Sequence, residues 1–190
     1  MYRIPGRAPF PRTFSLLGNI AANQAGWFAA VWGGAHDRFW PGVAAVLVLA
    51  AVHLVLSPAP AREAGLLLAA AVVGTLWDSL VVRLGLAVYP SGVLWPGTAP
   101  VWIGALWLLF GTSLNVSFAW LHGRPLLAGV FGALGGPIAW AGGWRLGGVM
   151  FPEPALALLT QAAGWAVLLP LLTWIAARTA GSAHRGPRPA

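Results

Sequence analysis

Cysteine and lysine are both absent from this 190-residue chain, and charged side chains of any kind are few. The lack of cysteine excludes a disulfide, a thiolate nucleophile and a cysteine-based metal site. Charged residues make up 8% of the sequence, whereas a soluble globular domain carries about 25%. With 58% hydrophobic residues the chain cannot cover itself with polar surface. We therefore predict an all-α integral membrane protein.

The few charges that are present are mostly positive, and all the positive side chains apart from histidine are arginines. A net charge of +7 would suggest nucleic acid as the partner of a soluble protein. Here the arginines fall in the tails and near the ends of apolar runs, where they set topology and meet anionic lipid headgroups. We expect the lipid bilayer as the partner and no nucleic acid.

Six apolar runs predict a bundle of six transmembrane helices within residues 14–176. The expected helices cover about 14–35, 41–56, 64–88, 99–121, 126–149 and 154–176. A basic arm at 1–13 precedes this domain and a basic tail at 177–190 follows it. The arm and the first run could be a signal peptide, but Asn19, Asn23 and Gln24 interrupt the run and favour a retained helix.

The positions of the arginines predict the orientation of the bundle. With the first residue inside, eight arginines fall on the cytoplasmic side and two on the outer side, with Arg83 within a helix. The inner set is Arg3, Arg7, Arg12, Arg62, Arg124, Arg178, Arg185 and Arg188, and the outer set is Arg38 and Arg145. Because positive residues are enriched in cytoplasmic loops, we expect both termini in the cytoplasm.

The first expected helix has a face of small residues. Ala22, Gly26, Ala30 and Gly34 recur every four positions. Small residues at this spacing let helices approach closely in lipid. We predict that this face is buried in the bundle, or that it contacts a second copy or another membrane partner.

Asp78 is the acidic residue that lies within one of the expected transmembrane helices. It lies near the middle of the third apolar run, in the segment Gly74-Thr-Leu-Trp-Asp-Ser-Leu-Val-Val-Arg-Leu-Gly85. A charge at the centre of a bilayer costs at least about 2.5–3.5 kcal/mol, which makes it a functional-site candidate. Arg83 is a poor partner, since good pairs along one helix are three or four residues apart. We expect Asp78 to bond Ser79, Thr75 or an amide of the first or fourth helix.

Polar residues on the other expected helices lie at different depths and predict a polar column through the bundle interior. The ligand-site or ion-site candidates are Asp78, Ser79, Arg83, Asn115, Asn19, Asn23, Gln161 and Arg145. An alternative is structural, because such groups also tie membrane helices together, at about 0.6 kcal/mol per hydrogen bond. That alternative is favoured for the three asparagines, and the functional one for Asp78.

Nothing in the sequence points to a metal or a cofactor. The four histidines are scattered without ligand spacing, and His53 is expected to be a packing or interface residue. There is no Gly-rich phosphate loop, nucleophile elbow or zinc-protease motif. We predict no metal and no cofactor, and the sequence assigns no catalytic residue.

Six short motifs together resemble one known family. They are Gly26-Trp27-Phe28, Trp77-Asp78-Ser79, Pro90-Ser91-Gly92, Leu114-Asn115-Val116-Ser117, Gly135-Gly136-Pro137 and Arg145-Leu146-Gly147. The set is similar to an uncharacterised bacterial inner-membrane family, domain of unknown function 2878. The resemblance implies a multi-pass protein of the bacterial inner membrane and assigns no activity. In size and helix number the family resembles the substrate-binding subunits of energy-coupling-factor vitamin importers, which implies a transporter subunit as one expectation.

Three functions remain open. The first is a protein that binds or transports a small or amphipathic molecule in a polar cavity around Asp78. The second is a membrane enzyme acting on lipid or acyl chains, with Asp78 as general acid; no second titratable group is clearly within its reach. The third is a scaffold without a ligand. The sequence favours the first and leans away from an enzyme.

Overall fold

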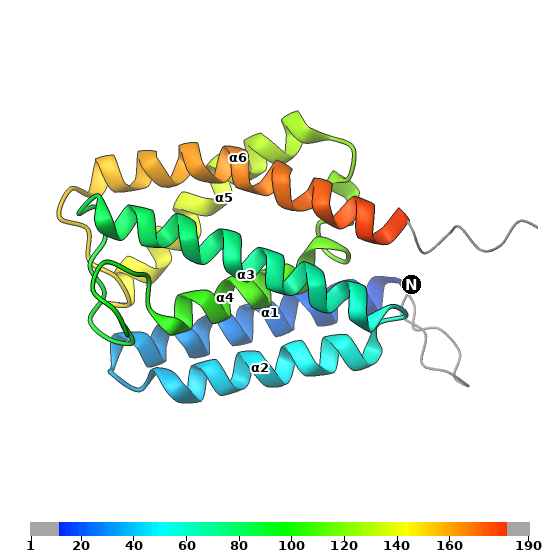
Figure 1. Cartoon of the computed structure of the whole chain (residues 1–190), viewed down its shortest axis with the longest axis horizontal. Helices are drawn as coiled ribbons and strands as arrows, with labels where there is room; N and C mark the ends of the chain where they lie inside the picture. Colours follow the sequence, from blue (N-terminus) through cyan, green and yellow to red (C-terminus); the bar gives the residue numbers. More distant parts are fainter. Residues whose placement is uncertain (1–11, 182–190) are drawn as a thin grey trace, which may run out of the picture.

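The computed structural model describes residues 12–181 as an all-helical bundle (Figure 1). The helices of this part of the chain are α1 (Arg12–Ala35), α2 (Phe39–Leu56), α3 (Pro60–Arg83), α4 (Val101–Leu114), α5 (Pro125–Arg145) and α6 (Pro154–Gly181). A short 3-10 helix, η1 (Ala119–Leu121), lies between α4 and α5. Residues 12–181 contain no β-strand, and a single backbone bridge joins Val88 to Met150. The predicted all-α class is confirmed.

Consecutive helices pack as three antiparallel pairs, α1 with α2, α3 with α4, and α5 with α6 (Figure 1). α4 is central, because it also packs against α1, α2 and, less extensively, α6. α6 in turn packs on α3. α5 contacts chiefly α6 and makes no extensive contact with α1. α1 and α5 meet where Trp27 lies beside Gly142, without extensive packing along their length.

Four of these helices are long and apolar enough to cross a membrane, namely α2, α3, α5 and α6. Only 28 to 33% of the residues in their most apolar windows are buried within the protein. Large apolar side chains cover their outer faces: Val55 is 80% exposed and Leu126 is 87% exposed. An apolar outer surface of this extent suits lipid better than water.

The other two helices are less typical of membrane spans. α1 is long enough, but Asn19, Asn23 and Gln24 lower its hydropathy. α4 has 14 residues, which rise only about 21 Å against a hydrocarbon core of about 30 Å. The helix predicted at 99–121 is wrong beyond Leu114, because Asn115 is the C-cap of α4 and Ser117 lies in the following turn.

Glycines with positive φ explain why two helices end earlier than predicted. α3 ends at Arg83 rather than at 88, because Gly85 takes a φ of 72° and its N–H bonds back to the last helical turn. α5 ends at Arg145 rather than at 149, and Gly147 takes a φ of 80° just beyond it. α6 continues to Gly181, past its predicted end at 176.

Candidate functional site

Asp78 lies on α3 with 1% of its surface exposed, so its carboxylate is inside the bundle rather than against lipid. Trp107 on α4 donates a hydrogen bond from Nε1 to Oδ2 at 2.7 Å. Gln161 on α6 donates a longer one from Nε2 to Oδ1 at 3.4 Å. Trp77 Nε1 donates to Gln161 Oε1 at 2.8 Å, which fixes the orientation of that amide. These four residues, the Asp78 site, join α3, α4 and α6 through neutral donors.

The partners predicted for Asp78 differ from those observed. Ser79 accepts a hydrogen bond at Oγ from the Ala99 N–H, at 2.9 Å, and so holds the loop before α4. Arg83 is exposed and donates from Nε to the Gly97 carbonyl at 3.1 Å. The amide expected from the first or fourth helix comes instead from Gln161, because α6 packs on α3 while α1 makes no extensive contact with it.

No cation among the described side chains, residues 15–180, pairs with Asp78. No arginine or histidine nitrogen in this range forms an ion pair with its carboxylate. Arg145, another predicted site residue, is exposed at the end of α5 and is not part of the wall beside Asp78. Neutral hydrogen bonds offset only part of the cost of burying a carboxylate. The buried Asp78 carboxyl therefore has hydrogen-bond donors but no countercharge from the described side chains.

A cavity of about 430 Å³ lies beside Asp78, between α1, α4, α5 and α6. Its wall is chiefly aromatic and aliphatic. Trp107 and Trp165 stack there with ring centroids 4.7 Å apart, and Tyr89 packs edge-on against Trp140. Small-molecule sites have volumes of about 300–1,000 Å³ and mostly apolar walls with a few polar groups. The cavity fits that description.

Two buried polar atoms beside this cavity have no hydrogen-bond partner: the Tyr89 hydroxyl and Trp165 Nε1. Burial raises the pKa of the Tyr89 phenol, and the nearby Asp78 raises it further, so the hydroxyl keeps its proton and can donate. More than nine in ten buried polar groups in proteins are paired. Two unpaired donors in one cavity wall indicate that an occupant with acceptor atoms, water or a larger molecule, completes it.

Two glycines let the indoles reach the Asp78 site. A Cβ added to Gly74 on α3 would overlap the Trp107 indole, and one added to Gly164 on α6 would overlap the Trp77 indole. Each ring therefore lies flat on a helix backbone that lacks a side chain. Sequence reasoning missed this arrangement, because a glycine within an apolar helix does not reveal which ring packs on it.

The predicted asparagines of α1 form a separate network with α4. Asn19 donates to the Thr112 carbonyl at 3.1 Å and accepts from the Ser117 hydroxyl at 2.6 Å. Asn23 donates to Thr112 Oγ1 at 3.1 Å. These bonds join α1 to α4, in keeping with the structural role favoured for the amides. Asn23 also contributes to the cavity wall.

The small-residue face of α1 is buried within the chain. Gly26 lies against Leu109 of α4, and Gly34 lies against Trp102 of the same helix. Ala30 is fully buried. This row therefore serves the close packing of α1 on its neighbours, the first of the two roles expected for it.

A second acidic cluster, which the sequence analysis missed, lies near the start of α3. Glu63 Oε2 is 3.1 Å from His53 Nε2 of α2, and Glu63 Oε1 accepts a hydrogen bond from Asn115 Nδ2 at 2.7 Å. These three residues form the Glu63 cluster, which lies about 22 Å from Asp78 along the helix at about 1.5 Å per residue. His53 therefore has a carboxylate partner, contrary to the expectation of a lone packing residue.

The signal that could have revealed this cluster is Pro60. Proline is common at the first position of a helix, and α3 does begin there. A helix starting at Pro60 places Glu63 in its first turn, whereas the predicted start at 64 left it in a loop. The expected polar column is thus three separate groups: the Asp78 site, the α1–α4 amide network and the Glu63 cluster. Asn115 belongs to the last of these.

Within the described residues, no group of three or more histidines and acids is arranged to hold a metal ion. The fold and the site define an all-helical protein of unknown activity, with several apolar helices that fit a membrane protein and a buried acid at a cavity. A family model described as Protein of unknown function (DUF2878) matches residues 16–171. This match covers most of the chain, so the protein belongs to that family. No curated protein and no solved structure matches the sequence significantly.

Proposed function

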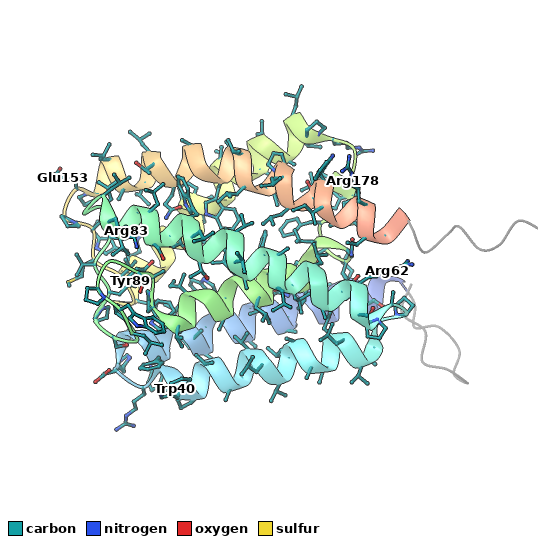
Figure 2. All side chains as sticks on the ribbon, viewed as in Figure 1. Trp40, Arg62, Arg83, Tyr89, Glu153 and Arg178 are labelled. Atoms are coloured by element: carbon teal, nitrogen blue, oxygen red, sulfur yellow. The ribbon has the colours of Figure 1, made fainter. Side chains whose placement is uncertain are left out.

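We propose that this is a multi-pass protein of the bacterial inner membrane, with six helices crossing the bilayer and both termini on the cytoplasmic side. The first turn of α1 and the last turn of α6 lie at the same end of the bundle (Figure 1). Arg62 and Arg178 lie at this end, and Glu153 lies at the opposite end (Figure 2). The arginine excess of the predicted inner side supports this orientation.

The proposed activity is the binding or transport of a small or amphipathic molecule in the cavity beside Asp78. The observation that carries it is a buried carboxylate, with no cation from the described side chains beside it, on the wall of a cavity of about 430 Å³. The unpaired donors of Tyr89 and Trp165 add to it, because an occupant with acceptor atoms would satisfy them. An acid buried among only neutral partners is costly, and such residues in membrane helices mark substrate and ion pathways.

Binding is favoured over catalysis by the composition of the cavity wall. Among the described residues that line it, the titratable side chains are Asp78 and Tyr89. General acid–base chemistry works best with groups whose pKa values lie near the operating pH. The Tyr89 phenol has its pKa raised away from neutral pH, so among the described side chains Asp78 has no second group beside it that could complete an acid–base pair.

Native mass spectrometry of the protein released from mild detergent micelles tests this proposal. We expect a bound small molecule on the wild-type chain, reduced in Asp78→Asn and retained in Glu63→Gln, the matched change at the other acid. Thermal unfolding against a panel of vitamins, amines and lipids is the second readout. A ligand at 100 times its Kd should stabilise the fold by about 2.7 kcal/mol. A chain that carries no adduct, and whose stability responds neither to the panel nor to Asp78→Asn, would refute the binding function.

A further inference from the structure

We infer that the molecule bound beside Asp78 is a lipophilic organic cation, with water or an acceptor atom of the ligand bonding the Tyr89 and Trp165 donors, an inference that rests on the proposed binding function. A buried carboxylate can be neutralised by a cation of the protein, by a proton or by a cation of the ligand. The described chain supplies no cation at this carboxylate. Glu63, by contrast, has His53 as its partner. The acid at the cavity is thus left to a proton or to a cation of the ligand, and a bound cation would take the place of that proton.

The wall of the cavity favours an organic cation over other ligands. No arginine or histidine from residues 15–180 lines it, so a phosphate or a carboxylate ligand would find no countercharge among these side chains. The rings of Trp102, Trp107, Trp140 and Trp165 do line it. Aromatic rings attract ammonium-type cations, most strongly where water is excluded.

A metal ion fits the cavity poorly. Asp78 is the single anionic ligand on its described wall, and the described residues contain no cluster of three or more metal-ligating side chains. Divalent metal sites need several oxygen or nitrogen ligands at short range. A volume of about 430 Å³ instead suits a molecule of many atoms.

The mouth of the cavity explains why the cation should be lipophilic. Ile20 of α1 and Phe131 of α5 both line the cavity and are 44% and 45% exposed. They stand on the two helices that make no extensive contact with each other. Both side chains are apolar, so in the proposed orientation the opening that they flank faces the acyl chains. A ligand entering there must partition into the bilayer first.

The test compares probes of matched shape and opposite charge. Tetraphenylphosphonium and the smaller benzyltrimethylammonium are titrated into purified protein, with tetraphenylborate as the anionic match of the first. Tryptophan fluorescence and thermal unfolding report binding. The variants are Asp78→Asn, and Glu63→Gln as the control for loss of an acid outside the cavity. Thermal unfolding without a probe shows that each variant is folded.

We expect at least one cation to bind and tetraphenylborate to bind at least tenfold more weakly. Asp78→Asn should weaken cation binding tenfold or more, and Glu63→Gln should leave it unchanged. Equal binding of cation and anion, no binding of either cation, or full binding to folded Asp78→Asn would overturn the inference. If native mass spectrometry then finds a neutral molecule that depends on Asp78, the binding function stands without the cation. If native mass spectrometry finds no bound molecule and the ligand panel does not change thermal stability, both the cation inference and the binding function are refuted.

Discussion

Replacing Gly74 with alanine should disrupt the Asp78 site, although none of the residues that form its hydrogen bonds is substituted. The new methyl group would overlap the Trp107 indole, which must then leave the face of α3. Its 2.7 Å hydrogen bond to Asp78 is lost with it. Overpacking costs about 1–3 kcal/mol and a side-chain hydrogen bond in a membrane protein about 0.6–1.7 kcal/mol. Alanine recovers up to about 1 kcal/mol of helix propensity, so the net loss should be roughly 1–4 kcal/mol.

The free energy of unfolding, measured by titrating the protein in mixed micelles with a denaturing detergent, gives this loss directly. Gly65→Ala is the matched control, because Gly65 is on the same helix and a Cβ there meets nothing within 4 Å. It should be neutral or slightly stabilising. In a Trp107→Ala background, Gly74→Ala should not lower the free energy of unfolding further, because the indole that the new methyl group would overlap is absent. A neutral Gly74→Ala in the wild-type chain, or an equal cost in both backgrounds, would show that the indole does not lie on Gly74.

Three other changes test the remaining groups. Glu63→Leu should destabilise the fold by about 1–3 kcal/mol, since it removes the closer of the two acceptors of the Asn115 amide. Adding His53→Phe to this variant should restore none of the loss, and an unaltered unfolding midpoint in Glu63→Leu would contradict the cluster. Asn23→Leu should cost only about 0.6 kcal/mol, because its bond joins α1 to α4 within the bundle; a loss of ligand binding with unchanged stability would instead mark it as a site residue. Glu153→Cys should react with an impermeant maleimide added outside intact cells and Arg62→Cys only after permeabilisation, in a chain with no other cysteine; the reverse pattern would invert the proposed topology.

The all-helical class and the burial of Asp78 could be predicted from the sequence because each follows from one strong energetic term. Long apolar runs with little charge have few alternatives to membrane helices. A carboxylate within such a run costs too much to face acyl chains, and it is 1% exposed in the structure. The helix ends were less predictable. Gly85 and Gly147 end α3 and α5 through their positive φ values, but glycine is also common within the helices of this chain.

The partners of Asp78 could not be predicted, because they depend on how the helices face one another. The chain has twelve tryptophans, and nothing in the sequence distinguishes the one that donates a hydrogen bond to Asp78. Trp107 is identified only once α4 lies on Gly74, and Gln161 only once α6 packs on α3. Positions along the expected helices give approximate depths for the polar groups without showing which of them meet. Asn115 is the example, because its partner Glu63 was expected to lie in a loop.

The two acids of α3 show how the chain treats a buried charge in two different ways. Glu63 is near the helix start, where His53 and Asn115 supply a titratable partner and an amide from neighbouring elements. Asp78 receives an indole and an amide, both neutral, although an arginine lies only five positions further along the same helix. That arginine, Arg83, bonds a loop carbonyl at the surface instead. An ion pair buried at Asp78 would carry its own desolvation cost, so neutral donors are not in themselves a poorer structural solution. Because the described side chains supply no cation, the Asp78 carboxyl is left to take up a proton or the cation that we propose as its occupant.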